Sequence, residues 1–258
     1  MGHLEGRVVV VTGAARGQGA AEAAALACEG AVVVATDVVE RPDRPIQDVS
    51  YRKLDVTLPG DWEALRAFLE ERYGRVDGLV NNAGITHRAR LGEVALQDWE
   101  RVFSVNVTGA LLGIQTLLPL MPRGASIVNV GSLAALTGHY TVAYTASKWA
   151  LRGLSRVASM ELGPRGIRVN TIHPGYIETP MTASAPPAFL EANDAATPLG
   201  RPGTVHDVAP LVVFLLSGES SYINGAEIPV DGGQWAHGGA KFLSDALQRE
   251  AMERSKGD

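Results

Sequence analysis

The stretch RVVVVTGAARGQGAAEAAALACEG, residues 7–30, decides the fold. It opens with a β-branched apolar run, passes Gly13, Gly17 and Gly19, and continues as an alanine-rich segment typical of a helix. Glycine allows a tight turn and a close approach of the backbone to a diphosphate, and a helix start presents unpaired N–H groups. The spacing is G-x-x-x-G-x-G, and the flanking strand and helix give the triplet its weight as a dinucleotide-binding turn.

The rest of the chain repeats this alternation of short β-branched runs and longer Ala/Leu-rich segments. The expected strands cover residues 7–12, 31–36, 51–56, 76–81, 125–130, 167–172 and 226–231. The expected helices cover about 17–29, 61–73, 97–119, 143–162 and 205–217, and the second has Asp61 as its expected N-cap and Gly74 just past its end. This pattern predicts an α/β fold, doubly wound, with a parallel sheet flanked by helices on both faces. No composition break marks a second domain, so residues 1–258 are expected to form one domain.

Composition narrows the class of protein. The chain has 258 residues, 46% of them hydrophobic, a net charge of −5 and no long block of like charge, which argues against nucleic acid as a partner. The N-terminal residues do not show the pattern of a signal peptide, and no apolar run is expected to approach the length of a membrane span, so we expect a soluble, cytoplasmic protein without membrane contact. Cys28, the lone cysteine, is expected in the core of a protein from a reducing compartment. The His, Cys and acidic positions show no metal-ligand spacing, so no metal is expected.

An acidic residue follows the second expected strand. Asp37 lies 18 residues after Gly19, where such folds place an acid against the adenosine ribose. A carboxylate there accepts hydrogen bonds from the 2′-hydroxyl and repels a 2′-phosphate, which favours NAD(H) over NADP(H). Arg16 in the glycine loop is a counter-signal, because it can meet a phosphate. Asp37 carries more weight, because no Lys or Arg follows it until Arg41.

A tyrosine and a lysine share one helical face. Tyr144 and Lys148 are four residues apart in AYTASKWAL, residues 143–151. A tyrosine that acts as a general base near neutral pH needs its pKa lowered by about three units, roughly 4 kcal/mol. An ammonium about 4 Å away supplies roughly that much at an effective dielectric of about 20. We therefore expect Lys148 to lower the pKa of Tyr144.

Two more polar residues accompany this pair. Ser132 comes just past an expected strand, 12 residues before Tyr144, at the strand end where parallel sheets bind ligands. Asn106 lies in an otherwise apolar expected helix, so its amide must be paired and can hold a water or a backbone group.

With these residues in place, the chain resembles the short-chain dehydrogenases/reductases. The matching motifs are TGAARGQG (12–19), LDVT (54–57), NNAG (81–84), SVN (104–106), GS (131–132), YTASK (144–148) and HPGYIETPM (173–181), in order over about residues 5–232. The resemblance implies a Rossmann-type fold with a seven-stranded parallel sheet and a catalytic tetrad of Asn106, Ser132, Tyr144 and Lys148. It also implies a homotetramer joined in part by the helices at 97–119 and 143–162.

The family pattern also extends the cofactor site. The residues expected to bind NAD are Gly13, Arg16, Gly17, Gln18, Gly19, Asp37, Asp55, Val56, Asn82, Ala83, Gly84, Tyr144, Lys148, Pro174, Gly175, Ile177 and Thr179. Asp55 is implied to lie near the adenine, and Ile177 and Thr179 to contact the nicotinamide amide. In the implied reaction Tyr144 exchanges the proton, Ser132 holds the substrate oxygen, and Lys148 holds the nicotinamide ribose.

The substrate is read from the segment 175–200, which corresponds to the family's mobile lid. It carries apolar side chains, three acids and no Lys or Arg, which suits a neutral hydrophobic alcohol or ketone. Arg88 and Arg90, after NNAG, weaken that argument because they can supply positive charge. The residues expected to contact substrate are Ser132, Tyr144, His139, Tyr176 and Met181, although His139 is equally a loop histidine without a role. His173 is expected to be structural.

The strings YTASKWALRGLS, IHPGYIETPMTA and SSYINGAEIPVDGG are similar to bacterial 3α,20β-hydroxysteroid dehydrogenases. This resemblance suggests a cyclic secondary alcohol such as a hydroxysteroid. The alternatives are a 3-oxoacyl carrier-protein reductase and a non-catalytic NAD-binding sensor. The C-terminal extension, about 236–258, has a possible apolar stripe of Phe242, Leu243, Ala246, Leu247 and Met252. It either covers a neighbouring subunit's site or is a frayed end.

Overall fold

Seven parallel strands form one sheet in the order β3-β2-β1-β4-β5-β6-β7. The computed structural model describes residues 2–183 and 185–255. The strands are β1 Val8–Thr12, β2 Val32–Asp37, β3 Val49–Lys53, β4 Gly78–Asn81, β5 Ser126–Val130, β6 Arg168–Pro174 and β7 Glu227–Val230. The strand order reverses between β1 and β4, and a ligand crevice is expected at the carboxyl ends of the strands beside such a reversal. The predicted doubly wound, seven-stranded parallel fold is confirmed.

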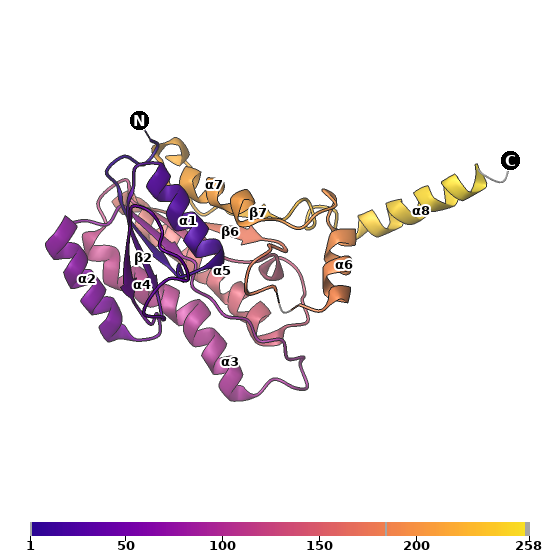
Figure 1. The fold of residues 1–258 in the computed structure, drawn as a ribbon, viewed down its shortest axis with the longest axis horizontal. Helices are drawn as coiled ribbons and strands as arrows, with labels where there is room; N and C mark the ends of the chain where they lie inside the picture. Colours follow the sequence, from indigo (N-terminus) through magenta and orange to yellow (C-terminus); the bar gives the residue numbers. More distant parts are fainter. Residues whose placement is uncertain (1, 184, 256–258) are drawn as a thin grey trace.

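Helices cover both faces of this sheet (Figure 1). They are α1 Gly17–Cys28, α2 Pro59–Tyr73, α3 Leu96–Phe103, α4 Gly109–Leu117, α5 Val142–Leu162, α6 Pro187–Ala196, α7 Val205–Leu216 and α8 Ala240–Arg254. A π-helical turn, η1 Ser104–Thr108, joins α3 to α4, and a short 3-10 turn, η3 Leu133–Ala135, follows β5. Helices α1 and α7 pack together on one face, whereas α2 and α4 pack together on the other.

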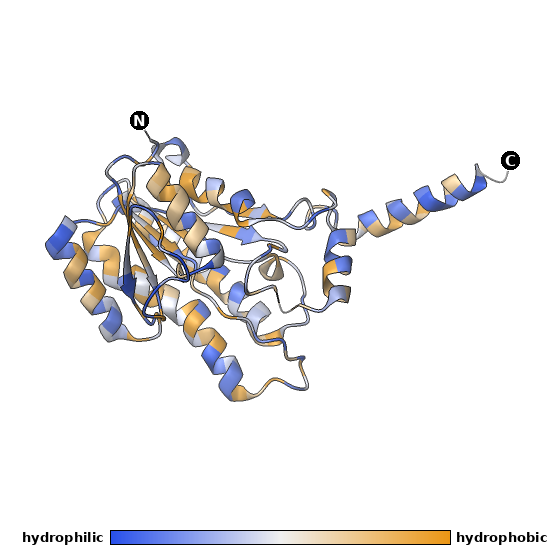
Figure 2. Cartoon of the chain, in the orientation of Figure 1, coloured by the Kyte–Doolittle hydropathy of each residue, from blue (hydrophilic) through white to orange (hydrophobic). Residues whose placement is uncertain are grey.

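Strand β1 shows why the apolar sequences of the strands do not alternate between polar and apolar residues. Val9 and Val11 join the core under α1 and α7, and Val8 and Val10 join the core under α2, α4 and α5. Because side chains of a strand alternate between faces, a sheet covered on both sides needs apolar residues at every position. Each fully buried valine contributes about 1.5–3 kcal/mol. Figure 2 shows the strands in the interior coloured mostly as hydrophobic.

Two local expectations need correction. The second helix begins at Pro59 with Leu58 as its N-cap, and Asp61 lies in its first turn, where its Oδ2 accepts a hydrogen bond from the Asp55 N–H at 2.8 Å. Proline is favoured in the first helical turn because its missing N–H would be unpaired there anyway. Gly74 follows the helix in the left-handed region, as predicted, with φ 68°.

Cys28 was expected in the core and is exposed. The buried residues of α1 are Gly19, Glu22, Ala23 and Leu26, which recur at helical spacing. Cys28 comes two residues after Leu26, and a helix turns about 100° per residue. Its side chain therefore points about 200° away from the buried stripe. The helical period, rather than the apolar neighbours in sequence, therefore places this thiol.

One helical run among the described residues, Leu96–Leu120, is long and apolar enough by length and composition to cross a membrane. This differs from the expectation that no apolar run approaches the length of a membrane span. Val102, Ala110 and Ile114 of this run are buried against the rest of the fold. Core helices of globular folds commonly pass such a test, so the finding is weak evidence for a membrane span.

The C-terminal extension forms α8, which projects from the body of the molecule (Figure 1). None of its residues is buried, and Phe242, Leu243 and Leu247 are more than half exposed. Met252, ten residues after Phe242, lies off the stripe that these side chains form. At the root of α8, Nε2 of His237 lies 2.8 Å from the Ala196 carbonyl oxygen of α6. Residue 184 of the expected lid and residues 256–258 of the expected extension lie outside the described residues.

Candidate active site

The predicted site residues gather at the carboxyl ends of the parallel strands. Most of them follow β1, β2, β3, β4, β5 and β6 directly, and Tyr144 and Lys148 come from the first turns of α5. Because parallel strands end at one edge of the sheet, these segments share a single crevice region.

The glycine loop between β1 and α1 suits a diphosphate. Gly13 and Gly17 have φ values of 67° and 58°, a region that side chains disfavour. A Cβ at Gly19 would lie 2.4 Å from the Gly13 carbonyl oxygen, so only glycine fits the close packing of the loop. No side chain caps the N-terminus of α1, where Arg16 is the N-cap and Gln18 lies in the first turn. Its free N–H groups and positive dipole end are available to the phosphates of a dinucleotide.

Asp37 ends β2 and supports this loop. Its Oδ2 accepts a hydrogen bond from the Ala15 N–H at 3.0 Å, and its Oδ1 accepts one from the Val38 N–H at 2.8 Å. Each carboxylate oxygen has a second lone pair, so Asp37 can also accept hydrogen bonds from a ribose. The residue therefore has a structural role in the loop in addition to the predicted ribose contact.

The Asp55 carboxylate after β3 is held within its own turn. Its Oδ1 accepts hydrogen bonds from the N–H and hydroxyl of Thr57, at 2.9 and 2.7 Å. Val56 is buried, and a Cβ at Gly109 would lie 2.8 Å from its Cγ2. Val56 thus packs into the core at the adenosine end of the predicted groove.

Asn82 and Ala83 bind the end of β4 to the glycine loop. Asn82 Nδ2 donates to the carbonyl oxygens of Thr12 and Gly13, at 2.9 and 3.0 Å. The Thr12 hydroxyl oxygen accepts from the N–H groups of Asn82 and Ala83, at 3.1 and 3.0 Å. Sequence reasoning missed this role of Thr12, although the threonine directly precedes the first glycine.

Asn106 lies in the π-helical turn η1 and is 1% exposed. Its Oδ1 accepts from the Ile85 N–H at 2.8 Å, and its Nδ2 donates to the Ile85 carbonyl at 3.0 Å and to the Ser147 hydroxyl at 2.9 Å. Both N–H donors of the buried amide are engaged, and the amide holds a backbone group, one of the two expected partners. The π-turn, a feature often found at functional sites, turns Asn106 towards the loop after β4. Ser147, which sequence reasoning did not select, in turn donates to the Tyr144 carbonyl at 2.7 Å.

The Ser132 hydroxyl lies close enough to the Tyr144 phenol to influence its pKa. The pKa of Tyr144 is raised, because the surrounding protein desolvates the phenolate, and the nearby Ser132 hydroxyl partly offsets this rise. Ser132 Oγ also accepts from the Ala134 N–H at 3.2 Å, which caps η3. The side chains of Ser132 and Tyr144 thus lie close together.

The expectation that Lys148 lowers the pKa of Tyr144 is wrong for this structure. Lys148 Nζ lies 5.8 Å from the centroid of the Tyr144 ring and donates to the Val130 carbonyl oxygen at 2.7 Å. Lys148 is 4% exposed, and burial lowers the pKa of its ammonium to about 8. Burial is the largest influence on the pKa of Tyr144, and Lys148 is not among the groups that shift it.

Asn106 and Lys148 meet beside Gly84. A Cβ at Gly84 would lie 3.4 Å from Asn106 Oδ1 and 3.5 Å from Lys148 Nζ. The loop after β4, the π-turn and α5 therefore come together at one point, as the predicted tetrad requires.

The segment after β6 lies next to the glycine loop. Pro174 ends the strand, the Gly175 N–H donates to the Val230 carbonyl at 3.0 Å, and Ile177 is 5% exposed. The Thr179 N–H donates to the Thr182 hydroxyl at 2.9 Å, a contact that sequence reasoning missed. A Cβ at Gly17 would lie 3.4 Å from Pro180 Cδ, so the start of the lid borders the diphosphate cradle.

Four rings form an aromatic cluster beside the loop between β5 and α5. Their centroid separations are 4.7 Å between His139 and Tyr140, 6.3 Å between His139 and Phe189, 6.5 Å between Tyr140 and Phe189, and 5.8 Å between Tyr176 and Phe189. Partial burial lowers the pKa of His139. His139 and Tyr176 thus lie together, whereas the expected substrate residue Met181 is 44% exposed, and its carbonyl accepts from Arg88 Nη2 at 3.1 Å. Tyr140 was not among the predicted contacts.

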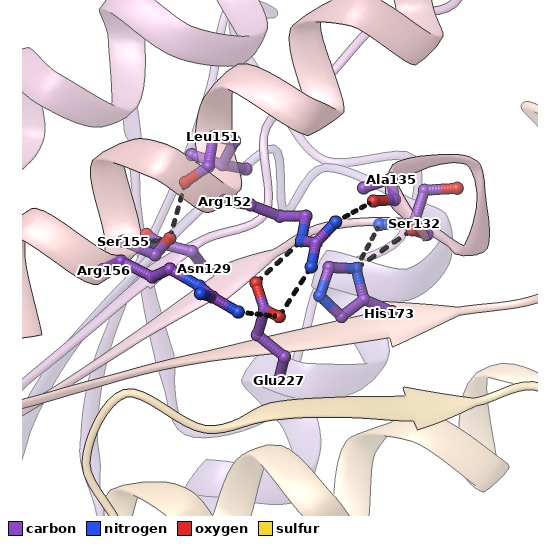
Figure 3. A network of polar contacts seen from close by, with 9 residues as sticks. All are labelled: Asn129, Ser132, Ala135, Leu151, Arg152, Ser155, Arg156, His173 and Glu227. Carbon is purple, nitrogen blue, oxygen red and sulfur yellow. Dashed lines mark hydrogen bonds and ion pairs between the residues drawn. The ribbon is translucent and has the colours of Figure 1, made fainter. Parts of the chain in front are cut away.

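A polar network supports the segment that carries Ser132 (Figure 3). His173, Arg152 and Glu227 belong to it, and none of the three was predicted to serve the site. Across residues 2–183 and 185–255, no group of three or more His, Cys, Asp or Glu side chains could hold a metal ion.

A dinucleotide cradle, a Ser–Tyr pair and a buried Lys at the switch-point edge define a class of nucleotide-dependent oxidoreductase. A family model described as "Enoyl-(Acyl carrier protein) reductase" matches residues 13–234. The chain belongs to the short-chain dehydrogenase/reductase family, whose members use the nicotinamide cofactors NAD or NADP.

Individual relatives span nearly the whole chain. The 3-alpha-(or 20-beta)-hydroxysteroid dehydrogenase of Mycobacterium tuberculosis is 43% identical over 242 residues, which cover 90% of this chain and 90% of that protein. The 3-oxoacyl-(acyl-carrier-protein) reductase FabG of Thermotoga maritima is 40% identical over 245 residues, which cover 90% of this chain and 98% of that protein. One similar crystal structure is a short-chain dehydrogenase/reductase from Brucella melitensis, described as a glucose/ribitol dehydrogenase. It has a TM-score of 0.84 at 34% identity, and the match covers 91% of this chain and 99% of that one.

Proposed function

We propose that this chain is an NAD(H)-dependent dehydrogenase that interconverts a secondary alcohol and a ketone on a hydrophobic cyclic substrate such as a hydroxysteroid. The observation that carries the proposal is the proximity of the Ser132 hydroxyl to the Tyr144 phenol, with the cluster of His139, Tyr140, Tyr176 and Phe189 on the loop and lid nearby. Aromatic rings offer flat apolar surface to a fused-ring substrate. The hydroxysteroid dehydrogenase of M. tuberculosis, 43% identical, supports the same substrate class.

The residues of the site divide the chemistry among them. A bound nicotinamide dinucleotide supplies or accepts the hydride. In the reductive direction Tyr144 donates its phenolic proton to the carbonyl oxygen, while the Ser132 hydroxyl holds that oxygen and stabilises the developing alkoxide. In the oxidative direction Tyr144 takes the alcohol proton. Burial keeps Tyr144 protonated, which suits its role as the acid.

Lys148 and Asn106 prepare the site. Lys148 donates to the Val130 carbonyl with one of its three N–H groups and retains two for the hydroxyls of the nicotinamide ribose. Asn106 holds the Ile85 backbone, which fixes the loop after β4 on which the ribose and nicotinamide would rest. The proposal therefore gives orientation of the cofactor to Lys148 and Asn106, and proton transfer to Tyr144.

Preference for NAD(H) rests on Asp37. Its carboxylate accepts from two backbone N–H groups and retains lone pairs for the 2′-hydroxyl of the adenosine ribose. A 2′-phosphate placed there meets like charge, which disfavours NADP(H). Arg16, exposed in the glycine loop, is the residue that favours the other cofactor.

The second candidate is a 3-oxoacyl carrier-protein reductase. The 40% identity with the T. maritima reductase favours it, and the family model is described by another reductase of the acyl carrier protein. The guanidinium of Arg90 lies 5.3 Å from the Tyr140 ring centroid, beside the aromatic cluster, where it can meet an anionic carrier arm. Against it, the lid segment 175–200 carries acids and no Lys or Arg. A non-catalytic NAD sensor would not need the Ser132–Tyr144 pair.

We also propose assembly as a homotetramer through α4 and α5. Trp149, Val157 and Met160 of α5 and Leu111 of α4 are exposed apolar side chains on these helices. Burial of such side chains between copies would stabilise the assembly. Light scattering coupled to size exclusion measures the mass, and a monomeric mass at micromolar concentration contradicts this proposal.

The test of the function is NADH oxidation followed at 340 nm with a panel of 3-keto and 20-keto steroids, cyclohexanones and an acetoacetyl thioester. We expect turnover with the cyclic ketones, faster with NADH than with NADPH. Preferential turnover of the thioester with NADPH supports the carrier-protein reductase. NADH binding by fluorescence without turnover of any ketone supports the sensor.

A further inference from the structure

His173 is a buried polar residue that the proposed reaction does not use. It lies at the end of β6 and is 0% exposed. A Cβ at Gly131 would lie 2.6 Å from its Nδ1 and 2.8 Å from its Cε1, so the ring packs directly against the glycine before Ser132. The residue before Ser132 must be glycine to admit this ring.

One nitrogen of the ring faces two backbone atoms of Ser132. Nδ1 lies 3.0 Å from the Ser132 carbonyl oxygen and 3.4 Å from the Ser132 nitrogen (Figure 3). With its proton on Nδ1, the ring donates to the carbonyl; with its proton on Nε2, it accepts from the Ser132 N–H. Both neutral tautomers therefore hold the backbone of the serine that contacts Tyr144.

The other nitrogen argues against a purely structural role. Nε2 is buried and has no hydrogen-bond partner among the described residues. A buried unpaired nitrogen costs free energy that an apolar side chain of similar size would avoid. Burial lowers the pKa of His173, with Arg152 and Lys148 acting in the same direction and the Ser132 carbonyl and Glu227 opposing it, so the ring is held neutral.

The far end of the serine segment is held as well. Arg152 Nη1 donates to the Ala135 carbonyl oxygen at 2.6 Å, and its Nε and Nη2 form a bidentate pair with Glu227 at 2.7 and 2.8 Å. Arg156 adds a second guanidinium to Glu227 at 2.8 Å. The segment 131–135 is thus held at its start by His173 and at its end by Arg152.

We propose that His173 is a positioning residue that fixes the Ser132 backbone and thereby the place of the Ser132 hydroxyl beside Tyr144. The inference rests on the proposed function, because it assigns that hydroxyl to the oxygen of an alcohol or ketone. His173 touches neither substrate nor cofactor in this assignment and acts through Ser132 alone.

The test compares His173→Leu, His173→Asn and the parent enzyme on the best ketone of the panel. A displacement of about 1 Å in a catalytic group costs roughly 100-fold in rate, so we expect His173→Leu to lower kcat by about 10- to 100-fold with a near-parental KM and NADH affinity. The amide of Asn occupies the position of Nδ1 and can bond either Ser132 atom, so His173→Asn restores most of kcat. Thr171→Val, on the same face of β6 and without contact to Ser132, is the matched control with parental kinetics.

A substrate-free measurement separates this inference from the proposed function. Crystal structures of the parent and of His173→Leu are expected to differ in the Ser132–Tyr144 contact, which the leucine variant loses and the asparagine variant keeps. If the parent reduces no ketone, the proposed function fails, and the crystal structures still decide the role of His173. Parental kcat for His173→Leu, or an unmoved Ser132 hydroxyl, overturns the inference. Should the leucine variant not fold, equal kcat values for His173→Asn and His173→Gln overturn it, because Gln places its amide at the position of Nε2.

Discussion

Lys148 Nζ lies 5.8 Å from the centroid of the Tyr144 ring and donates to the Val130 carbonyl oxygen at 2.7 Å. The lysine thus sits beside the phenol without a direct bond to its oxygen, and burial dominates the acidity of both groups. The pKa of Tyr144 is raised and that of Lys148 is lowered to about 8. The phenol is therefore a proton donor over the neutral range, before a cofactor adds its own charge.

The pH profile of ketone reduction follows from this relationship. Tyr144 must be protonated to act as the acid, and its raised pKa keeps it protonated well above neutral pH. We expect kcat/KM for the ketone, measured with saturating NADH, to stay flat from about pH 6 to about pH 7.5, below the Lys148 titration. A fall in kcat/KM through pH 7 would show that the Tyr144 phenol has a pKa near neutrality. It would support the expectation that the charge of Lys148 lowers this pKa.

Glu22 gives the fold a pH-dependent stability. It is 0% exposed in α1, its Oε1 accepts from Gln18 Nε2 at 2.9 Å, and its Oε2 has no partner among the described residues. Burial raises the pKa of Glu22 to about 8 from 4.5. The folded state holds this proton between those two values, so its stabilisation is complete below about pH 4.5 and is lost as pH rises through about 8.

Glu22→Gln removes this titration and keeps the size of the side chain. We expect the variant to match the parent near pH 5 and to exceed it at pH 8.5, with an upper limit of about 5 kcal/mol in the free energy of unfolding. Urea unfolding at the two pH values measures the difference. Glu71→Gln, an exposed change on α2, is the control. It should leave the pH dependence of the free energy of unfolding as in the parent. Parallel pH dependences for the parent and Glu22→Gln contradict the account of Glu22.

Cofactor preference depends on the Asp37 charge. We expect Asp37→Asn to lower the ratio of kcat/KM for NAD to that for NADP by about tenfold or more, because a neutral side chain no longer repels the 2′-phosphate. The asparagine oxygen still accepts one of the backbone N–H groups at 2.8 and 3.0 Å, so the loop is disturbed less than in Asp37→Ala. Steady-state kinetics with both cofactors gives the ratio. An unchanged ratio in both variants would remove Asp37 from the selection of the cofactor.

Phe189 joins the aromatic cluster, because it contacts the rings of His139, Tyr140 and Tyr176. Phe189→Ala removes a ring whose burial is worth a few kcal/mol, so we expect kcat/KM for a steroid ketone to fall by about 10- to 100-fold, mainly through KM. Cyclohexanone is the control substrate, since it is too small to span the cluster. Equal losses of kcat/KM for the steroid ketone and cyclohexanone would show that Phe189 supports the lid for every substrate. It would then not select substrates by size.

The sequence was sufficient wherever one period or one motif dictates the structure. The valine-rich strand Val8–Thr12, the glycine turn and the helix carrying Tyr144 and Lys148 could be predicted, because local pattern and tertiary fold agree there. The site residues after each strand follow from the parallel topology, which brings the strand ends to one edge.

Distances and burial could not be predicted in the same way. The i to i+4 spacing places Tyr144 and Lys148 on one face, yet the choice of the Val130 carbonyl by Lys148 depends on β5, 18 residues away. Similarly, the role of His173 depends on Gly131 in the neighbouring strand's loop, and the exposure of Cys28 on the helical phase of α1. Such contacts between distant segments carry no local signal in the chain.

The most direct test of the central claim is Tyr144→Phe, which removes one oxygen and keeps the ring. The account predicts parental thermal stability and NADH affinity, with a loss of about 100- to 10,000-fold in kcat for the cyclic ketone that the parent reduces best. Tyr222→Phe, at a fully exposed tyrosine, should behave as the parent. Turnover within a few-fold of the parent by Tyr144→Phe, with the fold intact, would contradict the assignment of proton transfer to this phenol.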